Sequence, residues 1–306
     1  MHIVVIGAGS LGCLLAGYLA RAEHDVYLVD TQLERTKAIQ QRGIVVEGVG
    51  GDFEVKARAG STYEGAKGPD LVLVCVKTYD TDRAARCIST FIDESTDILT
   101  LQRGVGNLEQ LARTLPREQL LAGTTALGAN LLGPGRVHHT HSGLTHIGDT
   151  YGDRSTNAEQ VAKLFSAARL PTIAADSIRE IIWSKLAVSV GISALSALLR
   201  VRNGRLLAND GTMQVMKSAV NECVAVANAS GVNLDSSVVS DAAREAARLT
   251  ASDRSSMLKD LLDGHRTEID ALNGAVVHRG QEIGVATPVN ETLTHLVRAL
   301  EHQLST

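Results

Sequence analysis

Lys185 is the residue whose type and surroundings most strongly suggest chemistry. It lies in the stretch Trp183–Val188 (WSKLAV), within a predicted helix that is otherwise largely apolar. Lysine is seldom buried without a partner, and burial lowers the pKa of its ammonium group. A partly buried lysine that faces a cleft can therefore donate a proton near neutral pH. On these residues alone, a lysine that reaches solvent from the edge of its helix is equally consistent.

A second polar cluster covers Arg266–Asp270 (RTEID). We expect a helix to begin at Thr267 or three residues earlier, which would place Glu268 in the first turn. A carboxylate there interacts favourably with the helix dipole, although an ordinary charged helix start fits the same residues. Upstream, Ser255 is predicted to cap a helix, and Ser256 beside it could bind a polar substrate.

Three glycines with the spacing G-x-G-x-x-G follow the first predicted strand, His2–Gly7 (HIVVIG), and open an apolar helix. In this position Gly7 allows a tight turn, Gly9 lets the backbone approach a pyrophosphate, and Gly12 lets the helix pack against the strand. The free N–H groups at the helix N-terminus favour an anion. The sequence therefore predicts a dinucleotide site formed by Gly7, Ala8, Gly9, Ser10, Leu11 and Gly12.

The residue that ends the second predicted strand bears on the choice of cofactor. Asp30 lies 18 positions after Gly12, where a carboxylate can accept hydrogen bonds from the adenosine ribose hydroxyls. The same carboxylate would repel the 2′-phosphate of NADP, so the sequence favours NAD. Arg35, one turn into the next predicted helix, could meet a phosphate and keeps NADP open.

These residues need a scaffold, and the pattern of the chain predicts one. Buried strands alternate with helices in the first half, which is typical of a doubly wound α/β domain of the Rossmann type. The expected strands are 2–7, 25–30, 70–77, 96–101, 119–125 and 172–175, with hairpins over 44–57 and 136–148. From residue 177 the spacing is helical, over 177–199, 209–230, 235–250, 255–263, 267–284 and 287–302, with Asp235, Ser255 and Thr287 as caps.

The predicted domains are therefore 1–175, which binds the dinucleotide, and 176–306, an all-helical substrate and catalytic domain. No low-complexity linker separates them, which suggests two packed domains with a cleft between them.

Composition excludes several other classes of protein. The 306 residues carry a net charge of −4 and only 3% aromatic residues, so neither a nucleic-acid binder nor an anionic-membrane binder is expected. Four scattered cysteines form no disulfide framework, which favours a reducing, cytoplasmic compartment. With no run of 18 apolar residues and no signal peptide, we expect neither a transmembrane helix nor secretion.

The chain resembles the ketopantoate reductase (2-dehydropantoate 2-reductase) family over essentially its full length. Several of the matching stretches, in this order, are typical of that family rather than of Rossmann proteins in general. They are Ile6–Gly12, Val76-Lys77, Gly104–Asn107, Gly123–Thr125, Thr145–Gly148, Trp183–Val188, Ser255–Asp260, Arg266–Asp270, Leu272–Gly274 and Thr287–Asn290.

The resemblance implies an enzymatic reaction and roles for particular residues. A hydride would pass from a nicotinamide cofactor to the keto carbon of a 2-keto acid, with 2-dehydropantoate, reduced to pantoate in pantothenate biosynthesis, as the expected substrate. Lys185 would protonate the developing alkoxide, and Glu268 would hold the lysine and the substrate hydroxyl. Ser256 would bind substrate, while Lys77 and Gly104 would lie on the cofactor side.

Departures from the family pattern put the substrate in doubt. The family usually has asparagine where this chain has Arg103, and asparagines at the positions of Ser189 and Ser193. These three residues are expected to line the substrate site. Thr31 stands where an arginine usually grips the NADP phosphate. Two alternatives therefore stay open: a dehydrogenase for another 2-keto or 2-hydroxy acid, and a nucleotide-binding sensor without turnover.

The histidines at 138, 139 and 141 raise the question of a metal. On a strand, His139 and His141 would share one face, as metal ligands can. No carboxylate or cysteine lies close to them in the sequence, and the family needs no metal, so we expect none. The expected partners are a small-molecule substrate and a second copy of the chain, bound through the helical domain.

Overall fold

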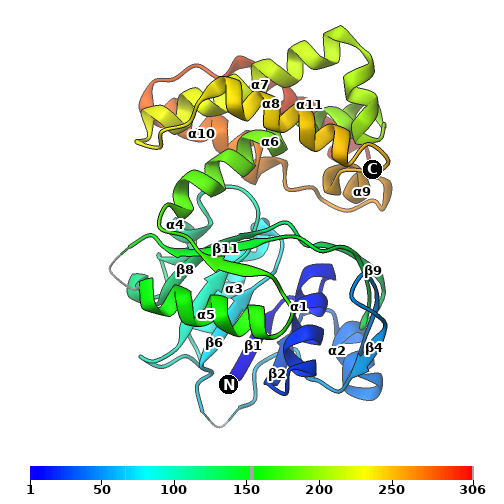
Figure 1. Cartoon of the computed structure of the whole chain (residues 1–306), viewed down its shortest axis with the longest axis vertical. Helices are drawn as coiled ribbons and strands as arrows, with labels where there is room; N and C mark the ends of the chain where they lie inside the picture. Colours follow the sequence, from blue (N-terminus) through cyan, green and yellow to red (C-terminus); the bar gives the residue numbers. More distant parts are fainter. Residues whose placement is uncertain (66, 152–154, 305–306) are drawn as a thin grey trace. The chain divides into compact units, whose positions relative to one another are not determined.

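The computed structural model describes residues 1–65, 67–151 and 155–304 of the chain. It divides into two compact units (Figure 1). The first comprises Met1–Gln102 and Asn107–Ile178, and the second comprises Arg103–Gly106 and Arg179–Thr306. The loop Arg103–Gly106 thus belongs with the second unit, whereas the domain boundary predicted from the sequence, after residue 175, places it in the first.

An eight-stranded sheet forms the centre of the first unit, in the order β12-β11-β8-β7-β6-β1-β2-β5. Neighbouring strands are parallel except β11 and β8. From β1 the chain first adds β2 and β5 on one side and then β6, β7 and β8 on the other side. Folds of this kind bind ligands beyond the carboxyl ends of the strands, at the point where the strand order changes side. The strands are β1 His2–Ile6, β2 Asp25–Val29, β5 Arg58–Gly60, β6 Leu71–Val74, β7 Asp97–Thr100, β8 Leu120–Thr125, β11 Thr145–Asp149 and β12 Thr172–Ala174.

Helices cover both faces of this sheet. Val5 of β1 belongs to an apolar cluster that includes Leu14 of the first helix and Phe165 of the fifth. Its neighbour Val4 points to the opposite face, where the cluster includes Ile88 of the third helix. Burial on both faces explains why these strands are nearly continuous apolar runs. The helices are α1 Ser10–Arg21, α2 Leu33–Arg42, α3 Thr81–Ile88, α4 Asn107–Leu111 and α5 Ser155–Ala167.

A second sheet has the order β4-β3-β10-β9. Strands β3 (Ile44–Gly48) and β4 (Phe53–Val55) pair antiparallel, which confirms the hairpin predicted over 44–57. The hairpin predicted over 136–148 is wrong, because β10 (Arg136–His141) pairs with β9 (Gly128–Gly133) and with β3, while β11 joins the large sheet. Alternation shows which residues share a face, but it does not identify the partner strand.

The histidines of β10 do not share a face as the sequence predicted. A register shift between His139 and His141 interrupts the alternation. His139 is buried with its Nδ1 2.9 Å from the Tyr18 hydroxyl, whereas His141 is exposed. Among the described residues, no group of three or more His, Cys, Asp or Glu side chains is placed to hold a metal ion.

The described part of the second unit contains helices and no strand, as predicted (Figure 1). Two predicted caps are confirmed: the Asp235 carboxylate accepts from backbone N–H groups at the start of its helix, and the Ser255 hydroxyl accepts from the N–H of Leu258. The helices are α6 Ile178–Leu199, η3 Asn203–Ala208, α7 Asp210–Ala229, α8 Ser236–Leu249, α9 Ser256–Leu262, η4 Ile269–Ala271, α10 Asn273–Ile283 and α11 Pro288–Leu304. The predicted fold class, a Rossmann-type sheet domain followed by a helical domain, is confirmed.

The helix predicted over 267–284 is wrong at its start. Glu268 precedes the single 3₁₀ turn η4, and Leu272, with φ −102° and ψ −100°, separates that turn from α10. Helical spacing in the sequence continues across this break, so it did not reveal the break.

Helix α6 is the core helix of the second unit. Leu186, Ala187 and Val190 are buried in its apolar cluster. Among the described residues it is the one helix long and apolar enough to cross a membrane by length and composition, and 61% of its most apolar window is buried within the protein. Polar residues interrupt its apolar sequence, so no unbroken apolar run predicts it. A buried core helix accounts for the same composition.

Candidate active site

The glycine turn between β1 and α1 is shaped by close backbone contacts. Gly7 has a φ of +104°, and its N–H donates to the carbonyl of Val29 at 2.8 Å. A Cβ at Gly12 would lie 1.9 Å from the carbonyl oxygen of Gly7, so only glycine lets α1 start so close to β1. A Cβ at Gly9 would meet no described atom within 4 Å. Gly9 therefore leaves open space on the side where a ligand would approach.

The start of α1 suits an anion. Gly9 is the N-cap and has no side chain to accept from the first turn, and that turn, which includes Ser10 and Leu11, contains no acidic residue. The first N–H groups of a helix and its positive dipole end attract phosphate. These features fit the pyrophosphate of a dinucleotide.

Asp30 holds the glycine turn in place. The residue is 9% exposed; its Oδ2 accepts from the N–H of Ala8 at 2.7 Å and its Oδ1 from the N–H of Gln32 at 2.8 Å. Sequence reasoning assigned Asp30 only to the ribose and missed this structural role. Arg35 does reach back to the strand end, since its Nη1 lies 3.5 Å from Asp30 Oδ2.

Lys77 lies near the same turn. It follows β6, the strand next to β1, and stands at the N-cap of η1 (Thr78–Asp80). A Cβ at Gly7 would be 3.0 Å from the backbone of Cys75 and Val76, so the segment that leads to Lys77 packs on the glycine turn. The glycine turn and Lys77 therefore lie at the carboxyl ends of two adjacent strands, β1 and β6.

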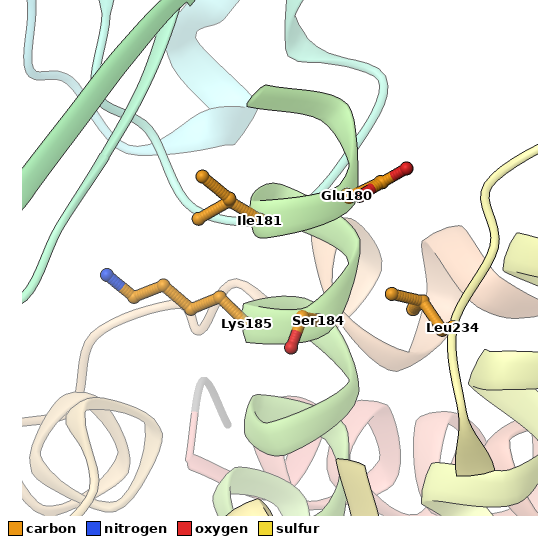
Figure 2. Close-up of a pocket in the computed structure, with 5 residues that line it drawn as sticks. All are labelled: Glu180, Ile181, Ser184, Lys185 and Leu234. Carbon is orange, nitrogen blue, oxygen red and sulfur yellow. The ribbon is translucent and has the colours of Figure 1, made fainter. Parts of the chain in front are cut away.

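In the second unit, Lys185 lines a hollow of about 350 Å³. Its other lining residues are Glu180, Ile181, Ser184 and Leu234. Figure 2 shows the side chains of Lys185 and Ile181 extending from one side of α6 and that of Glu180 from the other. Lys185 thus forms part of the wall of this hollow, while the amine end of its side chain points away from Leu234 (Figure 2).

The surroundings of Lys185 change its acidity. Burial, followed by the positive charge of Arg103, lowers its pKa from the ordinary 10.5 to about 7. Both causes disfavour the charged ammonium form. An amine with a pKa near 7 can hold or release a proton at neutral pH.

The loop Arg103–Gly106 is fixed against η4. Gly104 has a φ of +82°, and a Cβ there would lie 1.9 Å from the carbonyl oxygen of Ala271. Glu268, which is buried, precedes η4, and its carbonyl accepts from the N–H groups of Ala271 and Leu272. The structure therefore places Gly104 and Arg103 beside the turn that follows Glu268. The charge of Arg103 is close enough to Lys185 to lower the pKa of the lysine.

The serines predicted to bind substrate lie on two helices. The Ser189 hydroxyl donates to the carbonyl of Lys185 at 2.9 Å, and both residues lie on α6. Ser193 is buried, and its carbonyl accepts from Ser196 Oγ at 3.2 Å. Ser196 in turn donates to Ser255 Oγ at 2.6 Å, a link between α6 and the cap of α9 that sequence reasoning missed. Ser256 is the partly exposed first residue of α9.

Fold and site together define a Rossmann-type dinucleotide-binding protein with a helical second unit that carries a lysine of lowered pKa. The family model described as ketopantoate reductase PanE/ApbA matches residues 3–152, and the model of its C-terminal domain matches residues 177–301. The chain belongs to the ketopantoate reductase family, which confirms the resemblance seen in the sequence.

Relatives support this membership over whole chains. A 2-dehydropantoate 2-reductase from Halobacterium salinarum is 41% identical, covering 97% of this chain and 98% of its own. Another, from Archaeoglobus fulgidus, is 36% identical over 99% of both chains.

Solved structures are similar throughout. A D-mandelate dehydrogenase with NADH and anilino(oxo)acetate has a TM-score of 0.96 at 27% identity, with all of both chains covered. A PanE/ApbA family ketopantoate reductase from Ralstonia eutropha JMP134 has a TM-score of 0.91 at 36% identity, also with all of both chains covered. A nicotinamide cofactor is thus indicated for this fold and site.

Proposed function

We propose that the protein is an oxidoreductase that reduces a 2-keto acid, with 2-dehydropantoate as the first substrate to test and pantoate as its product. The observation that carries the proposal is Lys185, whose pKa of about 7 suits a proton donor at neutral pH. The names of the full-length relatives, 2-dehydropantoate 2-reductases, support the choice of substrate. A place in pantothenate biosynthesis follows from that reaction.

In this proposal each compact unit has its own task. Residues 1–175, apart from the loop Arg103–Gly106, would form the dinucleotide-binding domain, and residues 176–306, together with that loop, would form the substrate and catalytic domain. Gly7, Ala8, Gly9, Ser10, Leu11 and Gly12 would hold the pyrophosphate, with Asp30, Lys77 and Gly104 as further cofactor contacts. A bound nicotinamide would supply the hydride for the keto carbon.

The residues of the second domain would manage the proton and the substrate. Lys185 Nζ would give its proton to the keto oxygen as negative charge develops there, which stabilises the transition state. Glu268 would orient Lys185 and accept a hydrogen bond from the substrate hydroxyl. Ser256, Ser189 and Ser193 would contact the rest of the substrate. Arg103 could bind its carboxylate through two parallel hydrogen bonds.

We further propose NADH as the preferred cofactor, although the pairing of Arg35 with Asp30 leaves NADPH usable. The buried carboxylate of Asp30 would repel a 2′-phosphate. Arg35, 3.5 Å away, offsets part of that repulsion. A D-mandelate dehydrogenase of the same fold is known with NADH, which supports this preference.

A second substrate class has a specific basis. Arg103, Ser189 and Ser193 replace residues usual in ketopantoate reductases, and the D-mandelate dehydrogenase shares the whole fold at a TM-score of 0.96. An aromatic 2-keto acid, the oxidised form of mandelate, is therefore the alternative substrate.

One experiment separates these alternatives. We would measure NADH and NADPH oxidation with 2-dehydropantoate, with phenylglyoxylate and with small aliphatic 2-keto acids. The proposal expects the highest kcat/KM with NADH and 2-dehydropantoate. A clear preference for phenylglyoxylate would favour the alternative dehydrogenase. Absence of turnover with every keto acid, despite tight binding of the dinucleotide, would indicate a nucleotide sensor instead.

We also propose a cytoplasmic location and a homodimer formed through the helical domain. All four cysteines are free in the structure, which suits a reducing compartment. Light scattering of the purified protein gives its oligomeric state, and fractionation of cells gives its location.

A further inference from the structure

A chain of buried side-chain amides links four helices of the second unit. Asn273, the first residue of α10, and Asn290, in the first turn of α11, are both 0% exposed. Asn273 Nδ2 donates to Asn290 Oδ1 at 3.0 Å and to the carbonyl of Val190 in α6 at 3.2 Å. Asn290 Nδ2 donates to the carbonyl of Ala219 at 3.0 Å and to Glu222 Oε2 at 2.7 Å, both in α7.

Glu222 fixes the orientation of this network. Its Oε1 accepts from the N–H of Val289 and its Oε2 from the N–H of Asn290, each at 2.9 Å. A carboxylate at the start of α11 is favoured by the helix dipole. Because both Nδ2 protons of Asn290 face acceptors, its Oδ1 must face Asn273. The network therefore determines which way the Asn273 amide points.

Asn273 uses both of its side-chain donors but not its acceptor. Its Oδ1 is buried with no hydrogen-bond partner among the described residues. An unpaired buried acceptor is costly, and an apolar residue would remove that cost. The benefit of the amide must therefore come from its two donated bonds, one of which reaches the backbone of α6.

The position of these two bonds along the chain connects them to the active-site residues. Val190 comes five residues after Lys185 on α6, and Asn273 comes five residues after Glu268. Leu272, with φ −102° and ψ −100°, departs from the helical conformation between the Glu268 turn and α10. Backbone bonds still pass through it: its N–H donates to the carbonyl of Glu268 at 3.1 Å, and its carbonyl accepts from the N–H of Val276 at 3.3 Å. The amide of Asn273 thus gives a direct tie between the backbone that carries Lys185 and the segment that carries Glu268.

We propose that Asn273 is a positioning residue, which fixes the Glu268 turn relative to the Lys185 helix through its hydrogen bond to Val190. This inference rests on the proposed roles of Lys185 and Glu268. A general acid and its orienting carboxylate need close alignment, and a displacement of about 1 Å can lower a rate about 100-fold.

The test compares Asn273→Ala with Asn203→Ala. Asn203 is a matched control, because it lies in the same unit and is only 7% exposed. Its side chain donates one hydrogen bond, to Thr250, and its Oδ1 has no partner among the described residues. Among the same residues, its side chain makes no hydrogen bond to α6. We expect Asn273→Ala to lower kcat about 10- to 100-fold without changing the Kd for NADH. Asn203→Ala should lose thermal stability but keep its kcat within about twofold. If Asn273→Ala does not fold, Asn273→Ser, whose hydroxyl is too short to make both bonds, is measured in its place.

A double-mutant cycle with Glu268→Gln identifies the route of the effect. If Asn273 acts through Glu268, adding Asn273→Ala to Glu268→Gln lowers kcat by much less than it does in the unmodified enzyme. Equal losses in both backgrounds, or an Asn273→Ala loss no larger than that of Asn203→Ala, would overturn the positioning role. Neither result touches the proposed function, which fails if the unmodified protein turns over no keto acid or if Lys185→Ala retains full turnover.

Discussion

Lys185 combines two properties that a proton donor at neutral pH requires. It borders a hollow on α6, and burial together with the charge of Arg103 brings its pKa to about 7. With a pKa lowered in this way, the ammonium can still carry a proton near neutral pH and is acidic enough to release it. An exposed lysine would stay charged and would transfer its proton less readily.

The first prediction concerns loss of this donor. Lys185→Ala should lower kcat about 100- to 10,000-fold, the range typical of losing a general acid. The affinity for NADH should stay nearly constant, because the glycine turn belongs to the other compact unit. Stopped-flow kinetics and calorimetry give the two quantities. Lys217→Ala, at an exposed position on α7, is the control, and near-normal turnover of Lys185→Ala would contradict the assignment.

A second prediction concerns pH. In the proposed mechanism reduction requires protonated Lys185, so kcat/KM, which reports the free enzyme, should fall about tenfold per pH unit well above the pKa of about 7. Arg103→Ala removes a positive neighbour, so the pKa of Lys185 should rise and this fall should begin at higher pH. Burial, the larger cause, remains, so the pKa should not return to 10.5.

Arg103→Lys provides the matched control for this pH profile, because it keeps the positive charge. Its profile should stay close to that of the unmodified enzyme. If Arg103→Ala and Arg103→Lys shift the profile equally, the charge of Arg103 does not set the acidity of Lys185.

The third prediction concerns the choice between NADH and NADPH. Asp30 directly follows β2, and its carboxylate accepts from the N–H of Ala8 in the glycine turn. Asp30→Ala should therefore weaken binding of either dinucleotide. Asp30→Asn keeps an acceptor for that N–H and removes the charge. Combined with Thr31→Arg, it should raise the NADPH-to-NADH ratio of kcat/KM about 5- to 150-fold, which corresponds to 1–3 kcal/mol of relieved repulsion.

Steady-state kinetics with both cofactors test this third prediction. The double variant with Asp30→Ala should show the same change in ratio but lower affinity for both cofactors. If the unmodified enzyme already prefers NADPH, then Arg35 dominates the site and the interpretation of Asp30 is wrong.

At the scale of elements, the β1–α1 turn provides the fourth prediction. Gly9→Ala meets no described protein atom, so its free energy of unfolding should change by less than about 1 kcal/mol, whereas the methyl would obstruct the pyrophosphate. Gly12→Ala would push against the carbonyl of Gly7 and should cost several kcal/mol. Thermal unfolding and NADH titration should therefore separate them: Gly9→Ala weakens binding at unchanged Tm, and Gly12→Ala lowers Tm. Equal Tm losses would contradict the packing argument.

The sequence predicted those elements whose signals are local. It predicted the apolar strands of the large sheet, the glycine turn and the helical second domain. Burial and glycine geometry leave a pattern in residues that are neighbours along the chain, so these elements can be recognised locally. The hairpin over 136–148 was wrong because pairing is a long-range property, and β5 and β9 were missed. Likewise, nothing near Asp30 in the sequence reveals its bond to Ala8, which lies 22 residues away.

The candidate site shows the same limit. Lys185 and Glu268 were identified by residue type and family pattern, and their roles stay predictions. The burial that lowers the pKa of Lys185 depends on the packing of the second unit, and the effect of Arg103 depends on a loop far away in sequence. The turn before α10 could not be predicted, because Leu272 is an ordinary helix former whose backbone is set by its surroundings.

At the scale of the whole molecule, the proposed reaction needs groups from both compact units. The glycine turn belongs to the first unit, and Lys185, Glu268 and Arg103 belong to the second. In the proposed reaction, hydride and proton must reach the same carbonyl group, so it requires that both the nicotinamide and Lys185 come close to the bound keto acid. Binding of one ligand should therefore favour binding of the other.

The fifth prediction measures this coupling. In calorimetry, the keto acid should bind about 5- to 150-fold more tightly to the protein saturated with oxidised cofactor than to the protein alone, a coupling of 1–3 kcal/mol. ADP-ribose is the matched control, because it can occupy the glycine turn but lacks the nicotinamide ring that the keto acid would contact. It should produce a smaller increase in affinity. Equal affinity with and without the full cofactor would show that the two units bind their ligands independently, and the reaction proposed for them would then need another route to bring the ligands together.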